Sequence, residues 1–150
     1  MTLFLPLRSG SSGNATYIGT RQEGILIDAG ASAKSICTEL SLAGVEPSAV
    51  RGILITHDHN DHIKGLRVLA KRLRVPVWAT VETLEGIIDT GNLDPATPAE
   101  ELSSRMELAG MEVEPFDTPH DTAHSVGFRI RSGERVIGYA TALGRVTAEI

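Results

Sequence analysis

Apolar residues near the start of this chain occur in short continuous runs rather than at helical spacing. Thr2–Leu7, Ala15–Ile18 and Gly24–Asp28 are runs of this kind, bounded by turn-forming residues, and they predict strands. Gly52–Thr56 is a continuous apolar run of the type expected for a strand buried on both faces. Val75–Ala79 predicts a further strand. The first half of the chain is therefore expected to contribute a sheet.

Helical patterns lie between these runs. Ser32 or Ser35 can cap a helix that continues to about Ala43, where a glycine ends it. A basic helix is predicted to follow the Gly52–Thr56 strand and to end near residue 74, and another is predicted over Val81–Asp89. One side of the basic helix carries apolar residues at helical spacing, namely Ile63, Leu66, Leu69 or Ala70, and Leu73.

The last third of the chain is rich in strands. Short apolar runs separated by Gly-containing turns predict strands at Met106–Leu108, Met111–Phe116, Ser125–Arg131 and Arg135–Ala140. Residues 90–101 are expected to form a loop, and a helix is expected after Gly144. Alternating strands and helices followed by a strand-rich stretch predict a layered α/β fold.

The composition is that of a globular domain. With 150 residues, of which 41% are hydrophobic and 22% charged, residues 1–150 are expected to belong to one domain with a sizeable core. The apolar runs are far shorter than the roughly 18 residues of a membrane span, and no signal peptide is predicted. A single cysteine, Cys37, excludes an internal disulfide and fits a reducing cytosol, so we expect a cytoplasmic protein. Because the apolar runs are short, we also expect that it does not contact a membrane.

The net charge of −5 disfavours indiscriminate binding of polyanions. Positive charge is nevertheless concentrated on the predicted basic helix, where Lys64, Arg67 and Lys71 are spaced to form one stripe. Two interpretations of this stripe stay open. It is either a solvated helix face or a surface that guides phosphate groups.

All five histidines of the chain lie in two short segments, and they are His57, His59, His62, His120 and His124. The first three belong to HDHNDH (57–62), directly after an apolar strand. Alternate residues of a loop that leaves a strand project the same way, so His57 and His59 can bind one ion together, whereas Asp61 and His62 turn toward a second. Imidazole nitrogens and carboxylate oxygens are suitable ligands for Zn²⁺, Mn²⁺ or Fe²⁺.

Six motifs follow one another along the chain: SGSSGN (9–14), ILIDAG (25–30), ILITHDHNDHIKGL (53–66), PVWAT (76–80), HDTAHSVGF (120–128) and GYATALG (138–144). In this order they resemble the metallo-β-lactamase superfamily, and within it the YycJ/WalJ-type branch, whose relatives include the RNase Z and RNase J nucleases. The resemblance implies an α/β fold, an αββα sandwich with a binuclear metal site at one edge of its sheets. The chain is expected to hold only the N-terminal part of that sandwich.

The resemblance also implies a ligand set. His57 and His59 hold the first metal ion, and Asp61 and His62 hold the second. The third ligand of the first ion is either His120 or His124. The pattern of nuclease-like relatives implies His120, which we favour, whereas the pattern of thioesterase- and lactonase-like relatives implies His124.

Four further positions are candidates for supporting roles. Asp28 matches an aspartate that accepts a hydrogen bond from a ligand histidine, although a strand-end carboxylate can also be satisfied by backbone amides. Backbone N–H groups of Ser11, Gly13 and Asn14 can form a phosphate-binding nest, or the segment is only a turn.

Two features depart from the family pattern. Ala142 stands where the resemblance leads us to expect an aspartate that bridges the two ions, so occupancy of the second metal site is in doubt. The substitution is either engineered or natural. Relatives also continue well beyond the length of this chain, and their last ligand histidine lies there. A half sandwich is expected to expose apolar sheet surface, which a missing C-terminal half or a partner chain would cover.

These observations predict a metal-dependent hydrolase, foremost a phosphodiesterase or nuclease of the 5′-exonuclease type that acts on ends of single-stranded DNA or RNA. A hydroxide held by two ions, Zn²⁺ or Mn²⁺ or else Fe²⁺, would attack the phosphorus. Asp61 would orient the nucleophile or take its proton, and His124, if not a ligand, would protonate the leaving oxygen. The alternatives are a hydrolase of a lactone, thioester or cyclic phosphodiester, and a metal-binding module whose catalysis Ala142 has impaired.

Overall fold

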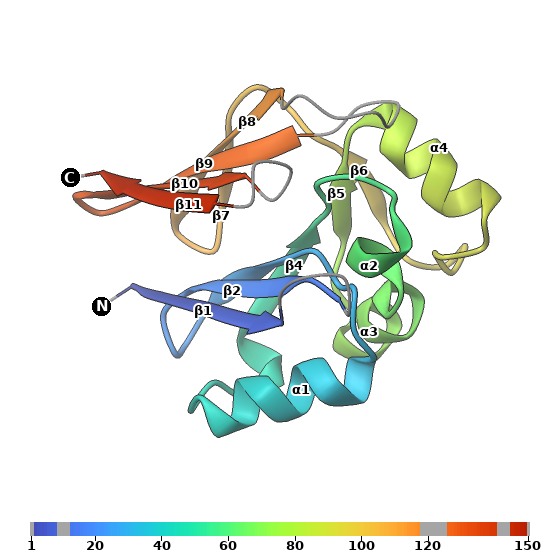
Figure 1. The fold of residues 1–150 in the computed structure, drawn as a ribbon, viewed down its shortest axis with the longest axis horizontal. Helices are drawn as coiled ribbons and strands as arrows, with labels where there is room; N and C mark the ends of the chain where they lie inside the picture. The colour runs from blue at the N-terminus through green and yellow to red at the C-terminus, as the bar shows by residue number, and fades with distance from the viewer. Residues whose placement is uncertain (1, 9–12, 118–125, 141–144, 150) are drawn as a thin grey trace.

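The apolar runs of the sequence assemble into two stacked β-sheets (Figure 1). The structure is a computed structural model, and it describes residues 2–8, 13–117, 126–140 and 145–149. Helices pack against the outer face of the N-terminal sheet, so the described residues form helix, sheet and sheet layers in that order. This is an α/β arrangement of the kind that the sequence predicts.

The N-terminal sheet is mixed and has six strands in the order β1-β2-β3-β4-β5-β6. The first two pairs are antiparallel, whereas β3 to β6 run parallel to one another. The strands are β1 (Leu3–Arg8), β2 (Ala15–Gly19), β3 (Gly24–Ile27), β4 (Val50–Leu54), β5 (Val77–Ala79) and β6 (Ala99–Glu101). The parallel strands place the loops that follow β3 and β4 at the same edge of the sheet.

The second sheet has five antiparallel strands in the order β11-β10-β9-β8-β7. They are β7 (Met106–Leu108), β8 (Met111–Asp117), β9 (Val126–Ser132), β10 (Arg135–Ala140) and β11 (Arg145–Glu149). The prediction of a helix after Gly144 is wrong, because residues 145–149 form a strand that pairs with β10. Their sequence includes the β-branched residues Val146 and Thr147, which favour this extended conformation.

The helices are α1 (Ala33–Leu42), a 3₁₀ turn (Pro47–Ala49), α2 (Asn60–Ile63), α3 (Leu66–Leu73) and α4 (Val81–Asp89). Ser32 is the N-cap of α1, since its hydroxyl accepts a hydrogen bond from the Ser35 N–H at 3.1 Å. Thr80 caps α4 in the same way. None of the helices in the described ranges is long and apolar enough to cross a bilayer.

The predicted basic helix is split into α2 and α3 at Gly65. A β-carbon at this position would lie 1.8 Å from the Ala31 carbonyl oxygen, and the Gly65 N–H donates to the Ala29 carbonyl oxygen at 2.8 Å. The helix is therefore interrupted at Gly65, where the backbone is hydrogen-bonded to the loop after β3. The predicted loop 90–101 is also shorter than expected, because β6 pairs with β5 at its end.

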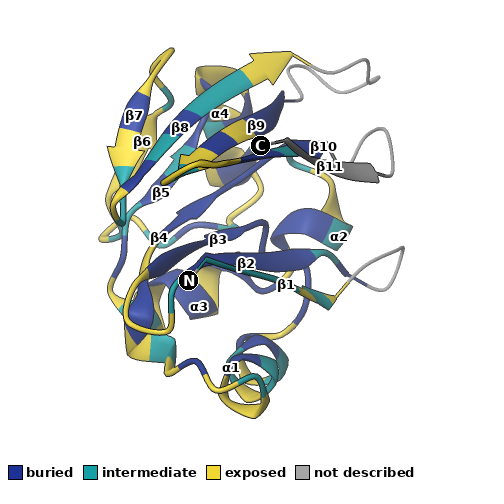
Figure 2. Cartoon of the chain, turned by 90° about the vertical axis from the view of Figure 1, so that its left-hand side faces the viewer, coloured by how far each residue is buried: buried dark blue, intermediate teal, exposed yellow. Residues whose placement is uncertain are grey.

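Two apolar clusters fill the spaces between the layers, as the buried residues in Figure 2 show. One face of the N-terminal sheet packs on the helices, with Leu26 and Ile53 against residues such as Ile36 and Leu69. The other face packs on the second sheet, where Ile27 lies in one cluster with Phe128. Both faces of β3 and β4 are thus buried, as the continuous apolar run of Gly52–Thr56 predicts for β4.

The expectation of an exposed apolar sheet face is wrong for the described residues. On the outer face of the second sheet, Glu112 lies opposite Arg131 and Glu114 lies opposite Arg129 across β8 and β9. In strands β1 to β10, where the structure describes burial up to Tyr139, Phe116 is the only exposed large apolar residue, and its ring lies over Gly127. Alternation along these strands directs the apolar side chains inward and the charged ones to solvent.

Candidate metal centre

Three loops meet at the edge of the N-terminal sheet, and backbone hydrogen bonds join them. The Asn14 N–H, from the loop before β2, donates to the Asp61 carbonyl oxygen at 2.7 Å. The Gly30 N–H, from the loop after β3, donates to the Asn14 carbonyl oxygen at 2.8 Å, and the Ala29 N–H donates to that of His62 at 2.8 Å. The HDHNDH loop is therefore held from two sides.

Close packing of the loops depends on a glycine. A β-carbon on Gly30 would lie 1.8 Å from the carbonyl oxygen of Asp61 and 2.6 Å from the backbone nitrogen of Asn14. Any side chain at this position would push the loop that carries Asp61 away from the strand ends. The glycine of the LIDAG motif thus sets the distance between the loops.

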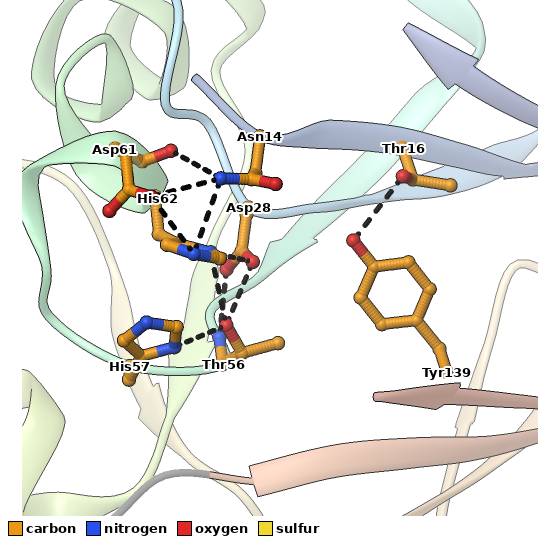
Figure 3. A network of polar contacts seen from close by, with 8 residues as sticks. All are labelled: Asn14, Thr16, Asp28, Thr56, His57, Asp61, His62 and Tyr139. Carbon is orange, nitrogen blue, oxygen red and sulfur yellow. Dashed lines mark hydrogen bonds and ion pairs between the residues drawn. The ribbon is translucent and has the colours of Figure 1, made fainter. Parts of the chain in front are cut away.

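Asp28 is the fully buried carboxylate beneath the site (Figure 3). It follows β3 with a positive φ of 66°, a conformation that aspartate tolerates better than most residues. Its Oδ1 accepts a hydrogen bond from the Thr56 N–H at 2.8 Å. Its Oδ2 accepts one from the Thr56 hydroxyl at 2.8 Å and lies 2.5 Å from the His62 Nδ1. Asp28 therefore contacts both a backbone amide and a histidine of the HDHNDH segment.

The surroundings of His62 shift its proton affinity. Burial lowers the pKa of His62, but the hydrogen bond to Asp28 and the negative charges of Asp28 and Asp61 outweigh burial and raise it above its usual value. A carboxylate accepts hydrogen bonds only, so the His62 Nδ1 carries a proton toward Asp28. In the neutral ring, Nε2 is then the acceptor nitrogen, as metal ligation requires.

Asn14 contacts the opposite side of the same loop. Its side-chain Nδ2 donates to the Asp61 carbonyl oxygen and to the Asp61 Oδ2, each at 3.2 Å, and lies 3.3 Å from the His62 Nε2. The Asp61 Oδ2 itself lies 3.6 Å from that nitrogen. Asn14, proposed from sequence as a phosphate contact, therefore contacts two of the predicted metal ligands.

The remaining histidines of the motif lie beside His62. The ring centroids of His57 and His62 are 3.9 Å apart, and those of His57 and His59 are 4.8 Å apart. His57 and His62 are buried, whereas His59 is exposed. The ring of His57 therefore contacts those of both His59 and His62, and Asp61 lies beside His62, with His59 toward solvent.

The structure describes four of the remaining predicted site residues, and the other four lie outside the described ranges. Lys64, Arg67 and Lys71 are exposed; Arg67 and Lys71 lie 3.9 and 3.5 Å from Asp94, and Arg67 also donates to the Gly91 carbonyl oxygen. Ser11, His120, His124 and Ala142 lie outside the described residues. Gly13 is described, and a β-carbon there would lie 2.8 Å from the Gly30 carbonyl oxygen.

Val126, two residues after His124 in the sequence, is hydrogen-bonded to the end of the strand that precedes the HDHNDH loop. The Val126 N–H, at the start of β9, donates to the Thr56 carbonyl oxygen at 2.9 Å. This hydrogen bond joins the second sheet to the strand end that carries the HDHNDH loop.

The donor chemistry of the site fits a divalent metal ion. Neutral imidazoles and a carboxylate are ligands of Zn²⁺ and Mn²⁺, and the buried Asp28 beneath His62 supplies the hydrogen bond that ligand histidines commonly make. Within the described part of the chain, no three His, Cys, Asp or Glu side chains meet closely enough to hold an ion.

Sequence reasoning missed the roles of Thr56 and Asn14. Thr56 stands immediately before the first histidine, and its hydroxyl lies 2.9 Å from the His57 Nδ1. The available signal was its position at the end of a buried strand, where a polar residue is unusual and requires a partner.

The fold and this edge of the sheet define the class of protein. The sequence profile of the Metallo-beta-lactamase superfamily matches residues 8–141, so the chain belongs to that superfamily. Members of the superfamily generally bind divalent metal ions, typically zinc.

Particular relatives narrow the similarity. The chain is 35% identical to exodeoxyribonuclease YycJ of Bacillus anthracis over 96% of its own length and 55% of the relative. It is 30% identical to exodeoxyribonuclease WalJ of Streptococcus pneumoniae over 94% of its length and 54% of the relative. The chain thus spans about half the length of these curated relatives.

Solved structures show the same fold at lower identity. A metallo-β-lactamase of Cronobacter sakazakii with a HARLDQ motif matches with a TM-score of 0.70 and 21% identity, over 86% of this chain and 56% of that one. The metallo-β-lactamase SMB-1 matches with a TM-score of 0.72 and 20% identity, over 98% of this chain and 58% of that one.

Proposed function

We propose that the protein is a metal-dependent hydrolase that cleaves phosphodiester bonds, as an exonuclease acting from the 5′ ends of single-stranded DNA or RNA. The observation that carries this proposal is the buried group of Asp28, Thr56, His57 and His62, which lies beside the Asp61 carboxylate. Similarity to exodeoxyribonucleases over nearly the whole chain supports a nucleic-acid substrate. Solved β-lactamases at about 20% identity support the fold alone.

The proposed roles follow from the chemistry of each side chain. His57, His59, Asp61 and His62, together with His120, would hold two divalent ions, Zn²⁺ or Mn²⁺. Bound ions of this kind supply Lewis acidity toward a phosphoryl oxygen.

Proton transfers would then fall to two residues. Asp61, with a side chain 35% exposed, is the proposed acceptor of a proton from the attacking water. As the water oxygen bonds to phosphorus, the bond to the leaving oxygen breaks. His124 is the proposed donor of a proton to that leaving oxygen.

Ala142 favours a second candidate function. A methyl group cannot ligate a metal ion, so a chain with alanine at the expected bridging position would bind fewer ions. Such a chain would be a metal-binding module with impaired hydrolysis.

One experiment separates these functions. The native chain and Ala142→Asp are loaded with Zn²⁺ or Mn²⁺, bound metal per chain is measured by mass spectrometry, and 5′-labelled single-stranded oligonucleotides are assayed. We expect Ala142→Asp to bind more metal and to release 5′ nucleotides faster, and His57→Ala to lose both properties.

Other outcomes distinguish the alternatives. Metal-loaded protein that leaves oligonucleotides intact but hydrolyses a lactone, a thioester or a cyclic phosphodiester is a small-molecule hydrolase. If both forms bind metal and hydrolyse nothing, the protein is a binding module. Failure of the native chain to bind metal with His57 and His59 intact contradicts the proposal altogether.

A further inference from the structure

The hydroxyl of Thr56 lies at the centre of the buried polar group (Figure 3). It donates to the Asp28 Oδ2 at 2.8 Å, and the His57 Nδ1 lies 2.9 Å from the same hydroxyl oxygen. Thr56 and Asp28 are both completely inaccessible to solvent, and His57 is 2% exposed. Water therefore cannot easily replace any of these contacts.

The direction of each hydrogen bond follows from counting protons. A threonine hydroxyl has one hydrogen, and Asp28, as a carboxylate, can only accept it. The hydroxyl oxygen must then accept the hydrogen bond from His57, so His57 carries its proton on Nδ1. In the neutral ring the acceptor lone pair lies on Nε2. The same carboxylate orients His62 directly, so Asp28 acts on both histidines, on one of them through Thr56.

We propose that Thr56 is a positioning residue whose hydroxyl, fixed by Asp28, holds the proton of His57 on Nδ1 and so presents the His57 Nε2 to a metal ion. The inference rests on the metal-binding function proposed above. It assigns the orientation of the first ligand to a residue that makes no contact with substrate.

Valine is the informative replacement, because it keeps the shape of threonine and removes the hydroxyl. We expect Thr56→Val to weaken Zn²⁺ binding, measured against a chromogenic chelator, by roughly 10- to 100-fold, as for other residues that orient ligands. Thr56→Ser, which keeps the hydroxyl, should restore most of the affinity. A Thr56→Val protein with native affinity, or a Thr56→Ser protein as weak as Thr56→Val, would overturn the proposal.

Thr16→Val is the matched control. Thr16 is also a buried threonine with one side-chain partner, the Tyr139 hydroxyl at 3.3 Å, but it contacts none of the histidines in the described residues. Its substitution should lower the melting temperature without changing Zn²⁺ affinity. An equal loss of affinity in both variants would show that Thr56 acts only through stability.

Nitrogen NMR of the metal-free native protein tests the inference even if Thr56→Val does not fold. We expect the imidazole of His57 to carry its proton on Nδ1. A proton on Nε2 would contradict the proposal, whatever the protein hydrolyses. Failure of the native protein to bind any metal would contradict the proposed function and leave the tautomer result to decide the role of Thr56.

A second, independent observation concerns the outer face of α1 and α3. A groove of about 460 Å³ between these helices is lined by Lys34, Cys37, Thr38, Ser41, Leu42 and Arg72. Two cations and two hydroxyls line it, and no acid does. No described residue forms an ion pair with Lys34 or Arg72, unlike Arg67 and Lys71, which lie beside Asp94.

The helices that line the groove are connected to the candidate metal centre along the chain. Both helices start just after loops of that site, and the Gly65 N–H, immediately before α3, donates to the Ala29 carbonyl oxygen at 2.8 Å. Lys34 and Arg72 place two positive charges along a groove that no acid lines, on a chain with a net charge of −5. We infer that this groove binds the phosphate backbone of the single-stranded nucleic acid on which the proposed nuclease acts.

The test is binding of a fluorescent single-stranded oligonucleotide as a function of salt. Neutralising two phosphate contacts should reduce the slope of log affinity against log salt by about 1.4, at about 0.7 per contact. We therefore expect a doubly substituted Lys34→Ala, Arg72→Ala protein to bind more weakly, with this smaller slope. Arg135→Ala, an exposed arginine of the second sheet, is the control and should bind like the native chain.

The possible outcomes distinguish failure of the groove inference from failure of the proposed nuclease function. Native affinity and slope in the double variant would contradict the inference while leaving nuclease activity intact. Loss of binding to an acidic peptide but not to the oligonucleotide would assign the groove to a protein partner and also contradict it. A native chain that binds no oligonucleotide would contradict the proposed function itself.

Discussion

Two aspartates of this chain each contact more than one partner, but their surroundings are opposite. Asp28 has no exposed surface and contacts Thr56 and His62 at 2.5 to 2.8 Å. Asp94 lies 3.5 Å from Lys71 and 3.9 Å from Arg67, whose side chains are 73% and 50% exposed. Burial alone distinguishes a fixed polar group from an exposed ion pair.

The largest effect is expected from removing the buried carboxylate. Asp28→Ala leaves His62 and Thr56 without their acceptor, and loss of one partner from a buried charged pair costs about 3–5 kcal/mol of unfolding free energy. Urea denaturation measures this loss. Asp94→Ala, the matched control, should lower the denaturation midpoint by a much smaller amount. Equal shifts in the two variants would remove the distinction between the regions.

Metal removal is expected to have the next largest effect. An ion that binds only the folded state adds about 2.7 kcal/mol of stability when its concentration is 100 times its Kd. Zn²⁺ should therefore raise the melting temperature of the native chain, and a chelator should reverse the rise. His57→Ala should abolish the Zn²⁺-dependent rise, whereas Lys64→Ala should retain it. A rise of native size in His57→Ala would exclude this histidine as a ligand.

Gly30→Ala tests the packing of the loops. The new β-carbon would lie 1.8 Å from the Asp61 carbonyl oxygen, so the loop must move. Overpacking of this kind typically costs about 1–3 kcal/mol, measurable by urea denaturation. Gly91→Ala is a control for the loss of a glycine, because no atom lies within 4 Å of its β-carbon position, although its φ of 76° adds backbone strain. We expect only Gly30→Ala to reduce Zn²⁺ affinity as well.

The smallest effect is expected at Asp94. Its pKa lies below the usual value because the Ala96 N–H donates a hydrogen bond to it, assisted by the charges of Lys71 and Arg67. A depressed pKa means that the carboxylate stabilises the fold above its unfolded pKa and that this contribution is lost as the pH falls. The difference between native and Asp94→Ala midpoints should therefore shrink as the pH falls toward 3. It should also shrink in 0.5 M salt, which screens the attraction of Asp94 to Lys71 and Arg67. A difference that persists under both conditions would show that Asp94 acts by packing.

Much of the fold was predictable from local pattern. The apolar runs predict β3 and β4 as strands, the second of them buried on both faces, and both apolar clusters contain residues from these strands. The break at Gly65 was not predictable, because the sequence on each side has helical spacing. The carbonyl of Ala31, distant in sequence, requires the glycine. The strand at residues 145–149 was missed for the same reason, since pairing with β10 decides it.

The candidate site shows the same division. The spacing of HDHNDH predicts a metal-binding segment, and the structure brings its three histidines and Asp61 together. Asp28 was proposed through the resemblance, and its contact with His62 is present. The contacts of Thr56 and Asn14 were not foreseen, because a single threonine or asparagine carries no periodic signal.

The sequence by itself determined which residues have the chemistry for metal binding and which runs form strands, because both depend on residue type and near-neighbour spacing. Only the tertiary structure decided which polar groups are buried together. Asp28 and His62 are 34 positions apart, and only the parallel pairing of β3 with β4 places their loops at one edge of the sheet. At that edge, burial fixes the proton positions that make imidazoles suitable ligands.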